Sequence, residues 1–434
     1  MIDPRLLSER RDEIAESCRR RGYDVDVDAA MAAHSEVARR QTERNEANRR
    51  RNEHQKAGKR KLEPDEREAH NNEGRRLKEA VAGLEAAVRE SQEALDQSLR
   101  AIPNFIHPDV PEGGEEDFAL LRQWGEPPVF SFEPVDHLVI CERLGLVDFE
   151  RAAKVAGQKF AFLVNEAAVL EMALQRYALD LVRAEGYVPY STPDLARPEI
   201  VDAMGYSPRG DETQVYSLAN ANLCLIGTAE IPLGGLHADT ILDEADLPLR
   251  LAGISHCFRT EAGTHGRESK GLYRVHQFSK VEMFVYCRPE ESEAILEELV
   301  AIEEKIFQGL EIPYRVIDVA SGDLGAPAYR KIDLEAWMPG RGEGGDWGEI
   351  TSASNCTDYQ ARRLHTRFRR AETKKNEMVH TLNGTAVACA RTIVALLENH
   401  QRADGSIAIP KALQPHMGCE KIGPRASGAK PRAQ

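Results

Sequence analysis

The chain lacks any long hydrophobic run. Of its 434 residues 41% are hydrophobic and 29% charged, and no stretch approaches the ~20 consecutive apolar residues of a transmembrane helix. The start, Met1–Pro4, has neither the charged and apolar regions of a signal peptide nor the acid-poor character of a transit peptide. We therefore expect a cytoplasmic protein without membrane contact, long enough for two or three domains.

Paired cysteines, excess basic charge and the common nucleotide-binding loops are also missing. The eight cysteines are scattered with no C-x-x-C pair, which argues against a disulfide framework and against a zinc cluster. The net charge of −14 argues against a globally basic nucleic-acid binder, so any RNA site must be a local patch. Neither a P-loop nor a dinucleotide-binding glycine motif after a strand occurs, so any nucleotide would have to bind through other groups.

Glycine and proline are nearly absent between about residues 27 and 101, except around Gly58 and Pro64. In the second half of this span, apolar residues follow the seven-residue spacing of a coiled-coil seam. The seam residues are Leu77, Val81, Leu84, Val88 and Leu95, with Ser91 at one seam position. We predict an antiparallel helical hairpin over about 27–101 with its tip near 57–65, preceded by a short helix over 4–22.

The first half of this hairpin is basic. From Arg39 to Leu62 there are ten Lys or Arg and three Asp or Glu, a charge of +7. A basic tip on a long arm of an acidic protein favours a polyanionic partner, and a dimerising coiled coil with a solvated charged face is the alternative. The residues expected to bind such a polyanion are Arg39, Arg40, Arg44, Arg49, Arg50, Arg51 and Lys56.

Prolines break up residues 102–134 and predict a linker there. Beyond it, helical stretches near 137–145 and 165–185 alternate with β-rich runs, which predicts an α+β domain with an antiparallel sheet flanked by helices. The β-rich runs lie near 187–192, 215–227, 249–259, 273–287 and 313–319. The predicted divisions are an N-terminal domain over 1–103, a linker over 104–135, a catalytic domain over 136–418 and a disordered tail over 419–434.

The stretch from Leu247 to Cys287 reads as two strands joined by a polar, glycine-rich loop over 262–272. Arg259 and Glu261 are two residues apart in the first strand, and Phe278 and Glu282 share parity in the second, so antiparallel pairing would put all four on one face. Arginine suits a phosphate or a carboxylate, phenylalanine can stack on a purine, and glutamate can hold an ammonium. An amino acid and ATP need such groups, and a salt-bridged surface hairpin is the alternative.

Phe258–Glu261 followed by Arg274–Glu282 resembles motif 2 of the class II aminoacyl-tRNA synthetases. Within that class the chain is most similar to the seryl-tRNA synthetases of bacteria and organelles, from its first residues to about Gly418. Gly186–Pro193 resembles motif 1, whose helix and strand form the dimer interface of the class. The resemblance therefore implies a homodimer with the class II catalytic fold, whose helical arm embraces the long variable arm of serine tRNA.

The resemblance also implies roles for the motif 2 residues and their neighbours. Arg259 would bridge the serine carboxylate and the α-phosphate of ATP, Glu261 would accept from the adenine amine, and Glu282 would bind the substrate ammonium and hydroxyl. Thr228–Glu230 would hold the α-amino group, and from burial alone we expect a cationic partner for Glu230. The residues expected to bind serine are Thr228, Ala229, Glu230, Arg259, Glu282, Asn383 and Thr385.

Thr381–Thr385 leads into a predicted helix, Ala386–Glu398, whose Arg391 lies on an apolar stripe and therefore needs an anion. That anion could be a protein carboxylate; by resemblance to motif 3 it would be the γ-phosphate of ATP. Glu349 and Ser352 match a family segment that coordinates Mg²⁺, and because they differ in strand parity a bulge or turn must intervene. The residues expected to bind ATP are Arg259, Thr260, Glu261, Val275, Phe278, Glu349, Ile350, Thr351, Ser352 and Arg391.

The resemblance thus implies a serine–tRNA ligase in which Arg259, Glu282 and Arg391 are catalytic and ATP and Mg²⁺, but not zinc, are required. It would form seryl-adenylate and charge serine tRNA, and selenocysteine tRNA where one exists. Alternatives are a paralog serving antibiotic biosynthesis or self-resistance, a non-catalytic regulatory RNA-binding relative, and a seryl ligase acting on a carrier protein, which should lack the arm. The loop over 339–346 is longer than in many relatives and has no assigned role.

Overall fold

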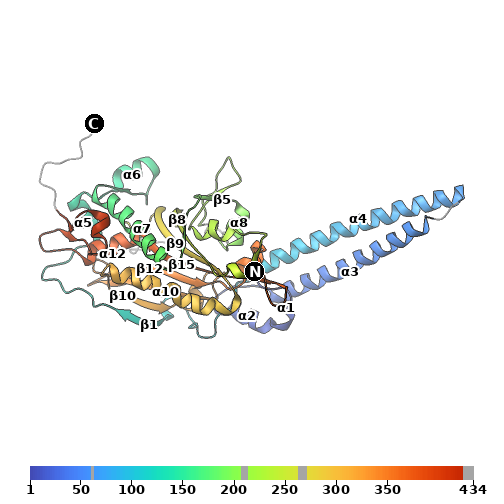
Figure 1. Ribbon diagram of the computed structural model, residues 1–434, viewed down its shortest axis with the longest axis horizontal. Coiled ribbons are helices and arrows are strands. Elements are labelled where there is room, and N and C mark those ends of the chain that lie inside the picture. The colour runs from blue at the N-terminus through green and yellow to red at the C-terminus, as the bar shows by residue number, and fades with distance from the viewer. Residues whose placement is uncertain (60–62, 207–213, 262–270, 424–434) are drawn as a thin grey trace. The chain divides into compact units, whose positions relative to one another are not determined.

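The computed structural model describes residues 1–59, 63–206, 214–261 and 271–423 (Figure 1). These residues form two compact units, Met1–Phe105 and Ile106–Gln434. Most of the predicted loop between the motif 2 strands, part of the predicted hairpin tip and most of the predicted tail lie outside the described ranges.

The N-terminal unit is built around the predicted helical hairpin, which is present as two long helices (Figure 1). The helices of this unit are α1 (Leu6–Glu9), α2 (Arg11–Arg20), α3 (Val27–Ala57) and α4 (Pro64–Ala101). The one helix expected over 4–22 is wrong, because the chain breaks at Arg10 into α1 and α2. The side chain of Asp26 caps α3 by accepting from the Ala29 N–H, and Pro64 opens α4 where no backbone donor is needed.

Hydrophobic packing is concentrated at the base of the hairpin. Ten buried side chains form the core there, and Val81 continues the seam along α4. The core residues are Ile2, Leu7, Ile14, Cys18, Val27, Ala30, Val37, Leu95, Leu99 and Ile102. Toward the tip, the rings of His54 and His70 stack with centroids 3.8 Å apart. The helices are therefore held together along their length by a narrow seam and at the base by a true core.

The second unit contains one eight-stranded sheet with the strand order β1-β10-β11-β12-β15-β9-β8-β4. Neighbouring strands are antiparallel, except that β4 runs parallel to β8, so the predicted antiparallel sheet is confirmed. The strands are β1 (Ala119–Trp124), β4 (Val188–Ser191), β8 (Leu249–Phe258), β9 (Gln277–Cys287), β10 (Tyr314–Asp318), β11 (Arg330–Met338), β12 (Asp346–Asn355) and β15 (His380–Ala388). Because β1 pairs with β10, the predicted linker contributes an edge strand to the sheet.

Helices cover one face of this sheet. They are α5 (His137–Leu144), α7 (Glu166–Ala184), α10 (Ser292–Gly309) and α12 (Cys389–Asn399). Helix α7 packs on β9, α10 packs on β12 and β15, and α12 packs on α7 and β11. Side chains such as Val281, Met283 and Leu299 are fully buried between the layers. The helices predicted near 137–145 and 165–185 are thereby confirmed. On the opposite sheet face, α9 (Glu230–Gly235) packs on β9 and α11 (Tyr359–Leu364) packs on β15, over a second hydrophobic core that includes Phe284 and Tyr286.

Several predicted boundaries are wrong. The motif 3 helix begins at Cys389 rather than Ala386, because β15 continues to Ala388. The β-rich run over 215–227 contains only the short strand β6 (Cys224–Leu225). Past Gly418, β17 (Lys421–Ile422) pairs with β16 (Ile407–Ala408), so the ordered chain extends beyond the predicted start of the tail.

Short elements complete the unit. The helices are α6 (Phe149–Ala156), α8 (Pro198–Ala203), α9 (Glu230–Gly235), α11 (Tyr359–Leu364) and α13 (Gln414–Met417), with 3-10 turns η1 (Glu115–Asp117), η2 (Glu244–Asp246), η4 (Pro289–Glu291) and η5 (Ser321–Asp323). The strands are β2 (Val147–Asp148), β3 (Phe162–Leu163), β5 (Leu195–Ala196), β7 (Ile241–Asp243), β13 (Arg367–Arg369) and β14 (Asn376–Met378). Strands β14, β13 and β7 form a separate three-stranded sheet.

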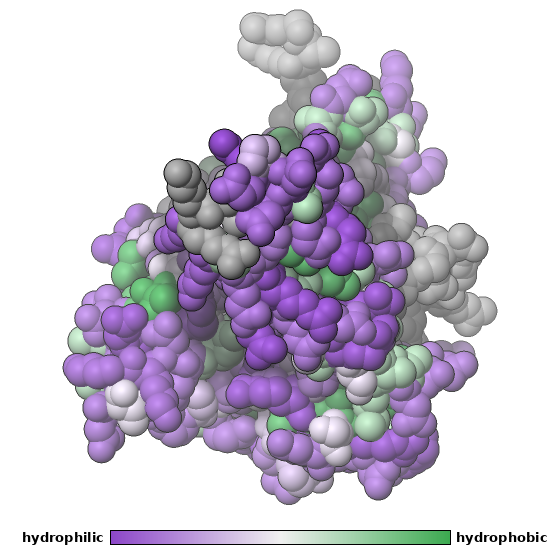
Figure 2. Space-filling model, turned by 90° about the vertical axis from the view of Figure 1, so that its right-hand side faces the viewer, coloured by the Kyte–Doolittle hydropathy of each residue, from purple (hydrophilic) through white to green (hydrophobic). Residues whose placement is uncertain are grey.

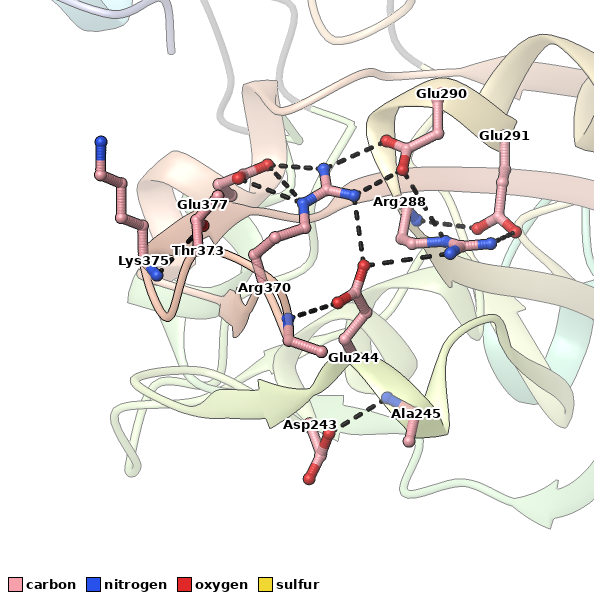
Figure 3. Close-up of polar contacts among 11 residues, drawn as sticks. Asp243, Glu244, Ala245, Arg288, Glu290, Glu291, Arg370, Thr373, Lys375 and Glu377 are labelled. Atoms are coloured by element: carbon pink, nitrogen blue, oxygen red, sulfur yellow. Dashed lines mark hydrogen bonds and ion pairs between the residues drawn. The ribbon is translucent and has the colours of Figure 1, made fainter.

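A surface ion cluster joins this small sheet to the turns η2 and η4 (Figure 3). Arg370 donates hydrogen bonds to the carboxylates of Glu244, Glu290 and Glu377, and Arg288 forms an ion pair with Glu291. The guanidinium of Arg370 lowers the pKa of Glu290 to about 2. We call these six residues the Arg370 cluster.

Hydrophilic side chains cover most of the face shown in Figure 2. In the parts of the chain that the structure describes, no helix is both long and apolar enough to cross a membrane.

Candidate active site

Polar side chains gather on the sheet face opposite α7, α10 and α12, beside the core formed under α9 and α11. Glu282 lies opposite Thr385, and Ser352 lies opposite Asp333. Directly opposed residues of antiparallel strands project to the same face, and residues two apart on one strand do so too. The four neighbouring strands β11, β12, β15 and β9 therefore present their polar side chains together.

A bulge in β12 puts the two predicted metal ligands on this face. Glu335 pairs with Glu349 but Leu334 pairs with Thr351, so Ile350 is the extra residue. The predicted interruption between Glu349 and Ser352 is thus confirmed, and both side chains share the face of Asp333. Thr351 points the other way and donates its hydroxyl to the fully buried Glu303 at 2.9 Å.

The motif 2 strands pair antiparallel as predicted, but one part of that prediction is wrong. Strand β8 ends at Phe258, and Glu261 has a φ of 49°, so strand parity does not place Arg259 and Glu261 on one side. Both residues nevertheless line one cavity with Phe278 and Arg274. Arg274 donates to the carboxylate of Glu261 at 3.3 Å, and the Arg259 guanidinium lies 5.4 Å from the centre of the Phe278 ring.

A larger cavity of about 600 Å³ adjoins this one and also contains Arg259. The buried carboxylate of Glu230 stands in it and accepts from the Tyr206 hydroxyl at 2.5 Å, the Gln360 amide at 2.7 Å and the Asn383 amide at 3.0 Å. Among the described residues a hydroxyl and two amides contact Glu230, and its expected cationic partner stays a prediction. Burial, together with the nearby charge of Glu282, raises the pKa of Glu230 to about 7.

Glu282, unlike Glu230, forms an ion pair with a cation within the described part of the chain. The Lys280 ammonium lies 2.5 Å from a Glu282 carboxylate oxygen, and both side chains are buried. The Thr385 hydroxyl donates to the same carboxylate at 3.2 Å. The cavity of about 600 Å³ is thus lined by Thr385, Glu282 and Asn383, and Lys280 lines both this cavity and the smaller one.

The motif 3 arginine meets a protein carboxylate, one of the two anions considered for it. Arg391 lies 3.0 Å from a Glu349 carboxylate oxygen and donates to the Glu349 carbonyl at 3.1 Å. Burial would raise the pKa of Glu349, but the positive charges of Arg391 and Lys331 lower it overall. Glu398 is engaged elsewhere, at 2.8 Å from both His137 Nδ1 and the Gly340 N–H.

Oxygen donors are available for a hard cation on this face. The side chains of Glu349, Ser352 and Asp333 project together, and the Asp333 carboxylate is buried beside the Lys331 ammonium at 3.5 Å. Carboxylate and hydroxyl oxygens are ligands that Mg²⁺ accepts. Within the described residues, no group of three or more His, Cys, Asp or Glu is arranged to hold a metal ion. The donor set therefore fits a cation that phosphate oxygens and water complete.

The remaining predicted residues contribute backbone and packing. Ala229, Val275 and Ile350 are buried, and the Thr228 hydroxyl accepts from the Glu230 N–H at 3.2 Å. The Thr260 N–H lies 3.4 Å from the Gln214 carbonyl.

On the arm, the predicted RNA-binding residues lie on α3. Arg39 and Arg40 bind Glu36, Arg44 binds Asn45, and Arg49, Arg50 and Lys56 are exposed. Arg51 is half-buried.

Sequence reasoning missed Lys280, Tyr206, Gln360 and Asp333. Only Lys280 carried a usable signal, since it lies between Phe278 and Glu282 at the same strand parity. Tyr206 and Gln360 come from distant segments and reach Glu230 only through the tertiary fold.

Comparison with known proteins first defines the class. The tRNA synthetase class II core domain (G, H, P, S and T) matches residues 215–400. The fold is shared with Giardia lamblia prolyl-tRNA synthetase in complex with prolyl-adenylate, at 15% identity and a TM-score of 0.56 over 64% of this chain and 54% of that one. Most of the site described above therefore lies in a segment that matches the class II tRNA synthetase core domain.

The N-terminal unit and full-length relatives narrow the class further. Residues 1–106 match the seryl-tRNA synthetase N-terminal domain. The serine–tRNA ligase of Treponema denticola is 50% identical over 98% of this chain and 100% of its own length. The structure of Pyrococcus horikoshii seryl-tRNA synthetase complexed with ATP matches with a TM-score of 0.89 and 40% identity, over 98% of this chain and 100% of that one. The chain belongs to the seryl-tRNA synthetase family.

Proposed function

We propose that this protein activates L-serine with ATP to seryl-adenylate and transfers the seryl group to the 3′ end of serine tRNA. The observation that carries the proposal is the meeting of two buried glutamates with Thr385 and Asn383 in a cavity that shares Arg259 with a second, arginine-rich cavity. The cavity that contains the two glutamates suits the ammonium and hydroxyl of serine. The arginine-rich cavity suits a triphosphate and a purine.

In this proposal the serine carboxylate is itself the nucleophile, and it attacks the α-phosphorus and displaces pyrophosphate. Arg259, which lines both cavities, neutralises the charge that develops between them. Glu261 and Phe278 receive the adenine, and Arg391 meets the terminal phosphate. Rate acceleration then comes from positioning and electrostatics rather than from a protein nucleophile.

Serine selectivity is assigned to the pairing of its hydroxyl with Thr385, Glu282 and Asn383. Alanine would leave these buried polar groups without a partner, which discriminates far better than a missing methylene. Mg²⁺ would be held by Glu349 and Ser352, where it would supply charge neutralisation for the phosphates. Asp333, on the same face, supports these ligands.

The same proposal includes a homodimer and a tRNA-binding arm. Helix α7 and strand β4 leave large apolar side chains exposed, with Met172 at 61% and Val188 at 53%, which is compatible with a buried interface in solution. The exposed cations of α3 would meet phosphates of the long variable arm of serine tRNA. Charging of selenocysteine tRNA with serine and a cytoplasmic location belong to this proposal.

Transfer of labelled serine to a serine tRNA, with ATP and Mg²⁺, tests the proposal beside threonine and alanine. Charging with serine alone is the expected result. Serine-dependent pyrophosphate exchange without tRNA charging would contradict the proposed function and favour a biosynthetic or carrier-protein role. The absence of both activities would favour the regulatory RNA-binding alternative.

A further inference from the structure

The loop between β11 and β12 is tightly built although it is rich in glycine. Gly342, Gly344 and Gly345 have φ values of 65°, 88° and 98°, which side-chain-bearing residues rarely adopt. The Gly340 N–H donates to the buried Glu398 carboxylate at 2.8 Å. A Cβ at Gly345 would lie 2.3 Å from the Trp337 ring. These contacts and φ values restrict the backbone conformation of the loop. Residues 339–345 include one arginine.

This arginine, Arg341, folds back over the first residues of β12. Its side chain is 20% exposed, and its Nη1 lies 3.0 Å from the point where residue 348 would carry a Cβ. The Tyr273 hydroxyl lies 3.1 Å from the same point. Residue 348 is glycine, so the Arg341 guanidinium and the Tyr273 hydroxyl can both approach the backbone directly before Glu349. Any larger residue there would displace at least one of them.

Tyr273 connects Arg341 to the phosphate-binding end of the site. The Arg341 guanidinium lies 5.0 Å from the centre of the Tyr273 ring, and the Arg391 guanidinium lies 4.8 Å from it. The Tyr273 hydroxyl donates to the Glu349 carbonyl at 3.2 Å, and Arg391 donates to the same carbonyl at 3.1 Å. Tyr273, Arg391 and the Glu349 backbone are thus one connected group, with Arg341 packed on its outer side.

We propose that Arg341 is a positioning residue for the triphosphate of bound ATP, acting through Tyr273 and Arg391. Two guanidiniums against one aromatic ring repel each other. The carboxylates of Glu349, 3.0 Å from Arg391, and Asp346, 3.9 Å from Arg341, offset part of this repulsion, and a phosphate bound at Arg391 offsets more of it. Arg341 confines the ring and so holds Arg391 toward the cavity. This inference rests on the proposed function, since it assigns the ligand of the cavity as ATP.

Serine-dependent pyrophosphate exchange by the full-length protein tests the proposal, with KM measured separately for ATP and for serine. Arg341→Met keeps the side-chain stem and removes the charge, and it should raise the KM for ATP about tenfold, the size of one lost charge-assisted contact. The KM for serine and the melting temperature should stay within twofold and 2 °C of the wild type. Arg341→Lys should recover part of the loss.

Gly348→Ala provides an independent route to the same state, because its Cβ would push on the Arg341 guanidinium. It should also raise the KM for ATP, and the double variant Arg341→Met with Gly348→Ala should be no worse than the stronger single variant. Glu343→Ala is the matched control in the same loop, since Glu343 is exposed, and it should leave both KM values unchanged.

Two results would overturn the positioning role. One is an unchanged KM for ATP in Arg341→Met, and the other is an equal rise of both KM values with a lower melting temperature, which would indicate a purely structural arginine. A wild-type protein without any serine-dependent exchange would instead contradict the proposed function.

Discussion

Two clusters of charged side chains in this molecule have opposite balances. The Arg370 cluster combines four carboxylates with two arginines on the surface. The arginine-rich cavity combines two carboxylates, Glu261 and Glu349, with four cations, of which Lys280 is paired with Glu282. These cations are Arg259, Arg274, Lys280 and Arg391.

The balance decides how each arginine is used. Arg370 donates hydrogen bonds to three carboxylates, so its guanidinium is engaged within the protein. The Arg391 side chain is exposed to a similar extent, 17% against 20% for Arg370, yet among the described residues it forms an ion pair with one carboxylate, that of Glu349. Partly buried cations in excess over carboxylates are costly unless an anion joins them. The comparison therefore separates a cluster whose charges are paired within the protein from one that, in the proposed function, is completed by the phosphates of ATP.

Removing Arg391 should have the largest effect. Arg391→Ala should lower serine-dependent pyrophosphate exchange by about 10²–10³-fold, the usual loss when a group that stabilises transition-state charge is removed. Sedimentation should show the same oligomeric state as the wild type. Normal exchange by this variant would remove the phosphate role of Arg391.

The cations of the arm extend the comparison. Arg39 and Arg40 donate hydrogen bonds to Glu36, whereas Arg49, Arg50 and Lys56 are exposed and Arg49 lies 3.7 Å from Glu53. Replacing these three exposed cations by alanine should lower tRNA charging at low tRNA concentration roughly 10–100-fold and reduce its salt dependence. Pyrophosphate exchange without tRNA should not change. The matched control replaces Arg75, Arg76 and Lys78 of α4, and an equal loss there would contradict the assignment to α3.

A smaller, graded effect is expected from Glu230. Its pKa of about 7 means that the carboxyl holds a proton below pH 7, while the serine ammonium requires the charged form. The KM for serine should therefore rise as pH falls below 7, by up to about tenfold per pH unit. The KM for ATP is the internal control. Glu230→Gln should bind serine weakly with no such pH dependence; a wild-type KM for serine that is flat from pH 8 to 6 would refute the assignment.

The Arg370 cluster should give the smallest effect. Arg370→Ala should leave charging unchanged and lower the free energy of unfolding by at most about 1 kcal/mol, as is typical of exposed ion pairs. Because the pKa of Glu290 is lowered to about 2, this contribution is present above its usual pKa and is lost only as pH falls toward 2. Equal stability of variant and wild type at pH 7 would mean that the cluster contributes nothing to the free energy of unfolding. A loss of charging activity would contradict the distinction between the two clusters.

The motif residues could be identified from the sequence because each motif is defined by residue types at fixed spacing along the chain. Strands β11 and β12 were not among the predicted β-rich runs, because residues such as Asp333 and Glu349 face the site and interrupt the apolar pattern. The end of β15 was misread as helix, since a run such as Ala386–Ala388 has no period that separates a buried strand from a buried helix.

The buried glutamates show what spacing alone cannot give. Glu230 was expected to need a cation, yet its partners Tyr206 and Gln360 come from elements that only the tertiary structure brings near. Glu282 obtains its cation from Lys280, two residues away on the same strand. Interaction partners on the same strand can be predicted from strand parity. Partners on elements distant in the sequence cannot be predicted in this way.

The bulge at Ile350 has a genetic consequence. It sets the phase between the two halves of β12, so that Glu349 and Ser352 share a face although three positions separate them. An in-frame loss of the codon for Ile350 would leave every other amino acid in place, yet it would turn Glu349 toward the helices or Ser352 away from the cavity. Natural variation at this locus should therefore tolerate substitution of residue 350 far more readily than its deletion.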